Sequence, residues 1–94
     1  MEPFVEIEHN NQFGSFYIRI DAKVAATMSF IFEGENRISI EHTAVEPEFN
    51  GKGFGRLLVA KAVEFAREKG YKIVPRCEYA QSIFNKTPSY NDVL

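Results

Sequence analysis

The chain has 94 residues, of which 45% are hydrophobic and 26% are charged. A chain of this length forms one domain with a small core, because folding buries only about 60–65% of its surface. Eleven basic residues against thirteen acidic residues give a net charge of −2, which argues against a dedicated nucleic-acid-binding protein. We therefore expect a single domain spanning residues 1–94, without a nucleic-acid partner.

The sequence also argues against a metal site, secretion and membrane insertion. Cys77 is the single cysteine, which excludes an intramolecular disulfide and a cysteine-based zinc site. The first residues carry no sign of a secretory signal, and no apolar run reaches the length of a membrane-spanning helix, about 20 residues. We expect a cytoplasmic protein that has no membrane contact and no bound metal.

The first half of the chain has the pattern of short strands separated by turns. Four segments rich in β-branched and aromatic residues run over residues 4–8, 16–20, 24–32 and 38–45. Their short connections predict an antiparallel meander. In the fourth segment, regular alternation would place on one face Ile38, Ile40, His42 and Ala44.

After Pro47 the pattern changes to that of an amphipathic helix. Apolar residues recur at spacings of three and four from Phe54 to Ala66, and Gly70 is a suitable C-terminal cap. A fifth strand over residues 71–74 follows, and then a short helix over residues 79–86. Because a strand–helix–strand unit needs a right-handed crossover, the fourth and fifth strands should be parallel neighbours. We expect an α+β fold: a mixed, mostly antiparallel sheet of about five strands, one long helix after a glycine-rich loop, and a short C-terminal helix.

The glycine-rich loop is the most informative segment, and it reads Asn50-Gly51-Lys52-Gly53-Phe54-Gly55-Arg56. Glycines let a ligand approach the backbone amides, and a helix N-terminus attracts anions. Residues 51–94 carry eight basic against four acidic side chains, whereas residues 1–50 carry three against nine. Such charge is often only the solvated face of a helix, but together with the loop it predicts a diphosphate site. The order of residues does not fit a P-loop, and the preceding antiparallel strands do not fit a dinucleotide-binding fold.

Three separated motifs match a known family in order and spacing. They are His42-Thr43-x-Val45, the glycine-rich loop, and Tyr71-Lys72-Ile73-Val74-Pro75-x-Cys77. From about Val24 onwards, the chain resembles the compact single-domain members of the GNAT acetyltransferases, which bind acetyl-CoA. The resemblance implies that the pyrophosphate of coenzyme A is bound by the amides of Gly51, Lys52, Gly53, Phe54, Gly55 and Arg56. It also implies that the pantetheine arm runs along the backbone of His42, Thr43, Ala44 and Val45.

Two side chains are candidates for the chemistry. Acetyl transfer to an amine requires a base that removes the ammonium proton. An imidazole, with an unperturbed pKa of about 6.5, suits this role at neutral pH, and His42 lies on the strand that the resemblance assigns to the pantetheine. Cys77, expected at the end of the fifth strand, could accept the acetyl group or protonate the leaving thiolate. The structural alternatives are a core histidine and a small buried cysteine.

The general acid is the open point of this assignment. Many GNAT enzymes place a tyrosine on the helix after the fifth strand, and the similar position here is Phe84, which has no proton to donate. Tyr79 and Tyr90 are possible substitutes, with packing as their more common role, and Glu41 is a second candidate base. We expect an N-acetyltransferase for an unidentified amine. The alternatives are a non-catalytic CoA- or acyl-CoA-binding module and an interaction domain whose loop is only structural.

Overall fold

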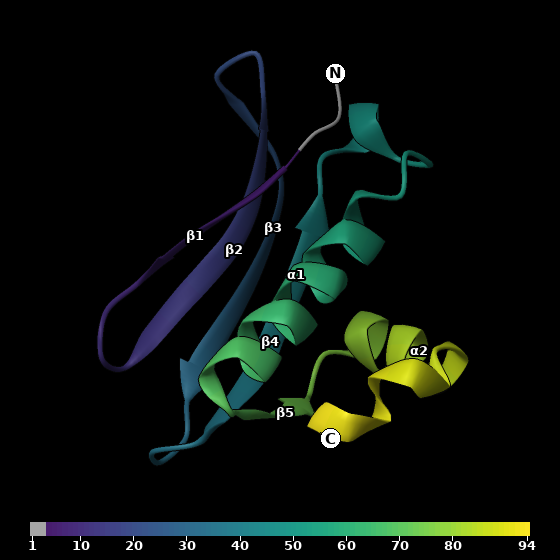
Figure 1. Ribbon diagram of the computed structural model, residues 1–94. Coiled ribbons are helices and arrows are strands. Elements are labelled where there is room, and N and C mark those ends of the chain that lie inside the picture. The colour runs from purple at the N-terminus through teal and green to yellow at the C-terminus, as the bar shows by residue number, and fades with distance from the viewer. Residues whose placement is uncertain (1–3) are drawn as a thin grey trace.

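A five-stranded sheet forms the largest part of the structure, a computed structural model that describes residues 4–94 (Figure 1). The strands lie in the order β1-β2-β3-β4-β5. Their bounds are β1 Val5–His9, β2 Phe13–Ile20, β3 Lys23–Phe32, β4 Arg37–Val45 and β5 Lys72–Pro75. The first four form an antiparallel meander, and β5 pairs with β4 in parallel. The expected mixed sheet is confirmed, although β2 begins earlier in the chain than its residue pattern suggested.

Helix α1 (Phe54–Lys69) crosses one face of this sheet (Figure 1). Its buried stripe has the predicted helical spacing and consists mainly of Leu58, Val59, Ala62, Val63, Phe65 and Ala66. Gly70 ends the helix in a left-handed conformation with φ of 74°, and its N–H group donates to the Ala66 carbonyl. Arg67 and Lys69 lie in the last turn, where positive charge is favoured by the helix dipole.

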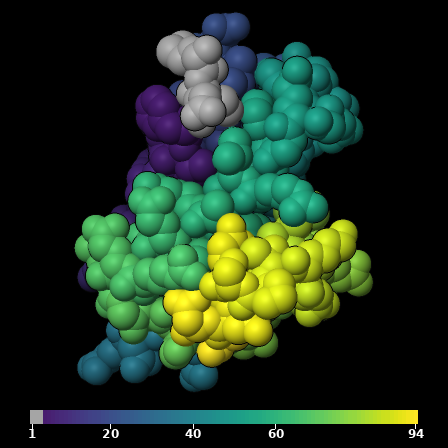
Figure 2. Space-filling model, turned by 45° about the vertical axis from the view of Figure 1, so that its right-hand side comes forward, coloured from purple at the N-terminus to yellow at the C-terminus, as the bar shows by residue number. Residues whose placement is uncertain are grey.

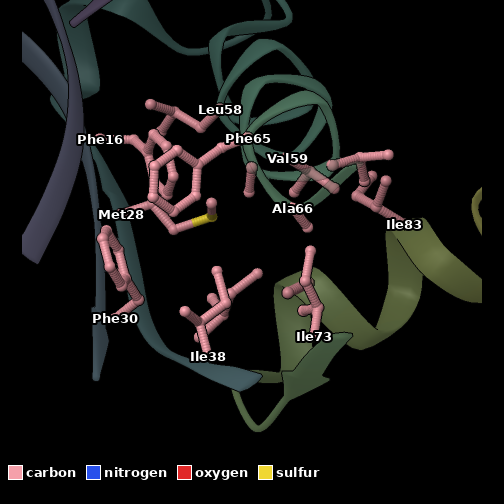
Figure 3. Close-up of a cluster of buried hydrophobic side chains, with 14 of the residues drawn as sticks. Phe16, Met28, Phe30, Ile38, Leu58, Val59, Phe65, Ala66, Ile73 and Ile83 are labelled. Atoms are coloured by element: carbon pink, nitrogen blue, oxygen red, sulfur yellow. The ribbon is translucent and has the colours of Figure 1, made fainter. Parts of the chain in front are cut away.

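The hydrophobic core lies between α1 and the sheet (Figure 3). The most deeply buried strand residues that face α1 are at most 1% exposed, and they include Phe16, Ile18, Met28, Phe30, Ile38 and Ile40. The ring centroids of Phe16 and Phe30 are 5.0 Å apart. Burial of each large apolar side chain contributes about 1.5–3 kcal/mol to stability. This packing fixes α1, and with it the loop at its N-terminus, against the middle of the sheet.

The C-terminal segment packs beside α1, as the contact between its yellow atoms and the green atoms of the helix shows in Figure 2. It comprises α2 (Glu78–Lys86) and a short 3-10 helix, η2 (Pro88–Val93). Its buried residues are Ala80, Ile83, Phe84 and Val93. A guanidinium nitrogen of Arg67 lies 2.7 Å from a carboxylate oxygen of Asp92, which ties the end of the chain to α1.

The other face of the sheet, called the outer face below, is not crossed by a helix in residues 4–94 (Figure 1). Along β2 and β3, half-buried residues alternate with the core residues and point to this outer face; they are Ser15, Tyr17, Thr27 and Ser29. None of the helices in residues 4–94 is both long and apolar enough to cross a membrane.

Strand β4 departs from regular alternation at Glu41. Phe30 pairs with Ile40 and Ser29 pairs with His42, so Glu41 is an extra residue that forms a β-bulge. Ile40 therefore faces α1, whereas His42 lies opposite Ser29 on the outer face and is exposed. The expectation that Ile38, Ile40, His42 and Ala44 share one face is wrong, because the bulge reverses the alternation after Ile40.

Candidate active site

Strands β4 and β5 separate after a short region of pairing. Their parallel pairing ends at Ile40 and Pro75, and the N–H groups of Arg76 and Cys77 both donate to the Ile40 carbonyl, at 3.0 and 3.2 Å. Beyond this point, β4 continues to Val45 with β3 as its only strand partner in the described residues. The other edge of β4 is thus open to an extended ligand that pairs with backbone groups.

The open edge leads directly to the glycine-rich loop, through the short 3-10 helix η1 (Pro47–Phe49). Gly51 and Gly53 have φ of 81° and 78°, which only glycine adopts without strain. Apart from the adjacent residues in the chain, a Cβ atom at either position would meet no atom of the described residues within 4 Å. The glycines are therefore required by the backbone conformation and leave the space in front of the loop free.

The start of α1 has the electrostatic character of an anion site. Gly53 caps the helix without a side-chain hydrogen bond, and no acidic residue lies in the first turn. Lys52 and Arg56 are exposed, and neither forms an ion pair in the described part of the chain. Two positive side chains thus stand at the end of the helix where the dipole already favours a negative charge. An anion bound to the loop amides would reduce the repulsion between these two side chains and the positive end of the helix dipole.

Gly55 has a different role from the other two glycines. It is buried in the first turn of α1, and a Cβ atom there would overlap the hydroxyl and ring of Tyr79. The side chain of Tyr79 therefore packs against the N-terminus of α1, next to the loop. This contact supports the packing role for Tyr79. The ring of Tyr90 lies 5.8 Å from that of Phe84, so it helps to anchor the C-terminal segment.

Cys77 lies beyond the end of β5 and forms the N-cap of α2, where its Sγ atom accepts a hydrogen bond from the Ala80 N–H at 3.4 Å. The same Sγ atom lies 3.2 Å from the Thr43 hydroxyl on β4. The thiol is half-buried. It was expected at the end of β5, which stops at Pro75 instead. The position of Cys77 next to β4 agrees with the expectation. The thiol lies in the gap that opens where β4 and β5 separate, called the wedge below.

His42 is not a core histidine, because its side chain is exposed on the outer face. Thr43, the next residue, pairs with Met28 and faces the α1 side, where it contacts Cys77. The candidate base His42 and the candidate thiol Cys77 are therefore associated with opposite faces of β4. A reactive group lying along the strand edge would be accessible from both faces.

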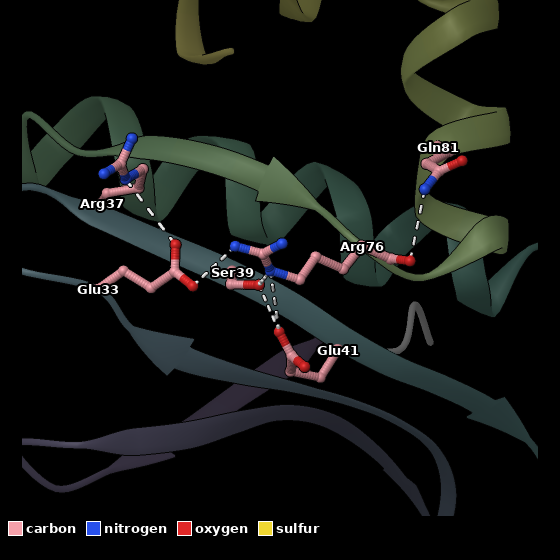
Figure 4. A network of polar contacts seen from close by, with 6 residues as sticks. All are labelled: Glu33, Arg37, Ser39, Glu41, Arg76 and Gln81. Carbon is pink, nitrogen blue, oxygen red and sulfur yellow. Dashed lines mark hydrogen bonds and ion pairs between the residues drawn. The ribbon is translucent and has the colours of Figure 1, made fainter.

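A polar network on the outer face fixes the bulge (Figure 4). The Arg76 side chain donates to Ser39 at 2.8 Å and to Glu33 at 2.9 Å, and its Nε atom lies 3.8 Å from a Glu41 oxygen. The hydroxyl of Ser39, which is fully buried, donates to the Glu41 carboxylate. The Nε atom of Arg37 lies 3.9 Å from a carboxylate oxygen of Glu33. The Glu41 carboxylate thus already interacts with Arg76 and Ser39, which makes it a poorer candidate for the base than His42. Sequence reasoning missed Ser39 and Arg76, because only the β4–β5 register brings them together.

Two comparisons place this arrangement among known proteins. A family model for the GCN5-related N-acetyl-transferases matches residues 15–93. Protein NATD1 from Mus musculus is 25% identical over 85 residues, which cover 89% of this chain and 77% of that protein. The chain belongs to the GCN5-related N-acetyl-transferase family.

Solved structures show the same fold. The solution structure of a GCN5-like protein from Staphylococcus aureus aligns with a TM-score of 0.72 and 36% identity, over 94% of this chain and 85% of that one. The ribosomal-protein-S18-alanine N-acetyltransferase from Escherichia coli aligns with a TM-score of 0.70 and 16% identity, over 83% of this chain and 53% of that one. At this identity the second likeness concerns the fold alone. The predicted family and fold class are confirmed.

Proposed function

We propose that this chain binds acetyl-CoA and transfers its acetyl group to an amine. The observation that carries the proposal is the continuity of two features, the open edge of β4 and the glycine-rich loop that follows it. One offers backbone groups to an extended amide chain, and the other offers amides and positive charge to a diphosphate. Membership of the GCN5-related family supports the same assignment.

The binding roles follow from this geometry. The amides of residues 51–56 would hold the pyrophosphate, with Lys52 and Arg56 adding charge from the sides. The backbone of residues 42–45 would pair with the pantetheine arm along the open edge of β4. The thioester end would then reach the wedge between β4 and α2, where Thr43 and Cys77 lie 3.2 Å apart.

The chemistry requires the acceptor nitrogen to lose two protons and the departing sulfur to gain one. Acetyl-CoA supplies an activated acyl group in the form of a thioester. His42, exposed on the outer face, would take the proton of the incoming ammonium directly or through water. The nitrogen–carbon bond forms as the carbon–sulfur bond breaks, and the nitrogen gives up its second proton to water. The departing sulfur takes a proton from the thiol of Cys77 or from water. Phe84 is 4% exposed and carries no acidic proton, so it has no part in this step.

Two measurements separate this proposal from its alternatives. Calorimetric titration with CoA should show binding, which an interaction domain with a purely structural loop would lack. Release of CoA thiol from acetyl-CoA in the presence of an amine panel should then exceed the rate without amine. Binding without amine-dependent release would favour the CoA- or acyl-CoA-binding module, for which the phenylalanine at position 84 is the specific argument.

We further propose that the chain acts as one domain in the cytoplasm. A reducing compartment keeps a lone, half-buried thiol such as Cys77 in its free form.

A further inference from the structure

A hollow of about 520 Å³ lies on the outer face of the sheet, away from the glycine-rich loop. Its lining includes Glu8 from β1, Phe13, Ser15 and Tyr17 from β2, and Thr27 from β3. Sites for small organic molecules commonly enclose about 300–1,000 Å³. The hollow is therefore large enough for a small ligand, and no helix in residues 4–94 covers it.

The hollow is connected to His42 by the strand register. Glu8 pairs with Ser15, Ser15 pairs with Ser29, and Ser29 pairs with His42. These four residues thus form one straight row across β1, β2, β3 and β4 on the outer face. With neighbouring strands about 4.8 Å apart, the row extends roughly 14 Å between its two ends.

Larger side chains border this row on both sides. Tyr17 pairs with Thr27 on one side, and Phe13 pairs with Ile31 on the other. Phe13 and Ile31 are 56% and 40% exposed, and because they pair with each other they form one apolar patch beside the row. Ser15 lines the hollow, and Ser29 continues the row from there toward His42. Both side chains are smaller than those of Tyr17 and Phe13, which leaves room above the row. A flexible aliphatic chain fits in this space.

The charge at the far end of the row is not balanced. Glu6 lies 3.4 Å from Arg19, whereas Glu8 accepts a hydrogen bond only from the neutral Tyr17 hydroxyl, at 3.2 Å. Within residues 4–94, no cationic side chain forms an ion pair with Glu8. Arg19 also lines the hollow, but its charge is paired with Glu6, which lies outside the lining. On this part of the outer face, Glu8 is thus a carboxylate whose charge is not balanced by an ion pair.

We propose that the acceptor is a linear aliphatic amine with a second positive charge, a diamine or polyamine. This inference rests on the proposed acetyl transfer. One amino group lies at His42, at the edge where the thioester is expected, and the second ammonium lies at Glu8. The carbon chain lies over Ser15 and Ser29, between Tyr17 and Phe13. The outer face thereby determines the class of substrate, while the glycine-rich loop binds the cofactor on the α1 side.

The test compares two compounds of equal length: diaminooctane, with an ammonium at each end, and octanediol, with a hydroxyl at each end. Binding is measured without acetyl-CoA, by following amide chemical shifts in NMR titrations. We expect diaminooctane to bind more tightly and to shift the amides of Ser15, Thr27 and Ser29. Glu8→Gln should weaken the binding of diaminooctane about three- to five-fold, as expected for the loss of an exposed ion pair, and leave the binding of octanediol unchanged.

The matched control is Glu68→Gln, which removes an exposed carboxylate from α1, on the other side of the molecule. It should leave both affinities unchanged. Equal affinity for the two compounds, or shifts confined to residues away from the outer face, would overturn the inference. So would a Glu8→Gln variant that keeps its melting temperature and the full affinity for diaminooctane.

Steady-state acetylation distinguishes this inference from the function on which it rests. If the protein acetylates amino-octanol, which has an ammonium at one end only, with the same kcat/KM as diaminooctane, acetyl transfer stands and the diamine inference fails. If it binds diaminooctane along the row but releases no CoA thiol with any amine, the binding site stands and acetyl transfer fails. Where both hold, Glu8→Gln should raise KM for diaminooctane about three- to five-fold with kcat unchanged.

Discussion

The hydroxyl of Thr43 lies 3.2 Å from the thiol of Cys77, although the two residues are 34 positions apart in the chain. This contact joins the open edge of β4 to the first turn of α2. It exists because β5 leaves β4 after Pro75 and the chain turns back toward β4 at Ile40. A ligand lying along the edge of β4 would therefore reach the thiol without a change in the backbone.

The first prediction concerns this thiol. On long incubation with acetyl-CoA, the Cys77 thiolate should attack the thioester, so that the protein gains an acetyl group and free CoA is released. Intact-mass spectrometry should detect the added acetyl group, and the Cys77→Ser variant should not gain it. The serine retains an oxygen that can cap α2, so stability should be nearly unchanged. An unmodified wild-type protein with CoA binding confirmed would assign Cys77 to packing and capping alone.

The second prediction concerns the glycine-rich loop. Gly53→Ala places a Cβ atom in front of the loop and should lower CoA affinity at least about ten-fold, because hydrogen bonds from the amides to a charged group are strong. Both this change and Gly34→Ala force a non-glycine residue into a left-handed conformation, at a cost of about 1–2 kcal/mol. Gly34 lies in the β3–β4 turn, so it is the matched control for strain. Calorimetry should show full CoA affinity for Gly34→Ala. An equal loss of CoA affinity in both variants would contradict the proposal that the amides of the glycine-rich loop bind the diphosphate.

The third prediction concerns His42. His42→Gln retains a polar side chain of similar size but cannot act as a base, so the acetylation rate should fall at least about 100-fold. Because the side chain is exposed, the melting temperature and the CoA affinity should change little. A stopped assay with a good amine substrate and thermal unfolding test both points. An unchanged rate would remove His42 from the mechanism.

The fourth prediction concerns the contact between Gly55 and Tyr79. Alanine is normally favoured over glycine in a helix, by up to about 1 kcal/mol in its interior, but a Cβ atom at Gly55 in the first turn of α1 would overlap the Tyr79 ring. Gly55→Ala should therefore be less favourable in the wild type than in the Tyr79→Ala background, by about 1 kcal/mol. Urea denaturation of the four proteins in this double-mutant cycle gives the coupling energy. A coupling of zero would mean that Tyr79 does not pack on the loop.

The fifth prediction concerns pH. The hydrogen bond from Arg67, followed by its positive charge, holds the pKa of Asp92 below the ordinary value. A carboxyl whose pKa is lower in the folded state stabilises that state above its ordinary pKa, about 3.9, and this contribution is lost as the pH falls further. The wild type should thus exceed Asp92→Asn in stability at neutral pH, and the difference should shrink below about pH 4. Chemical denaturation at a series of pH values measures it, and a constant difference would contradict the pairing.

The residue pattern by itself determined the five strands, the two α-helices and their order, but not the two 3-10 helices. The helix over residues 54–69 follows from apolar spacings of three and four, and its end follows from Gly70. The glycine-rich loop was recognised in the same way, because positive φ and the start of a helix are local properties. The parallel pairing of β4 with β5 followed from the handedness rule for the strand–helix–strand unit.

Only the tertiary structure decided on which face of the sheet each site residue lies. His42 turns to the outer face because Glu41 is an extra residue opposite β3, and nothing within β4 itself indicates that bulge. The contact of Cys77 with Thr43 and the row from Glu8 to His42 depend in the same way on pairing between distant segments. The physical reason is that a strand has a period of two residues, so one added residue reverses every side chain that follows.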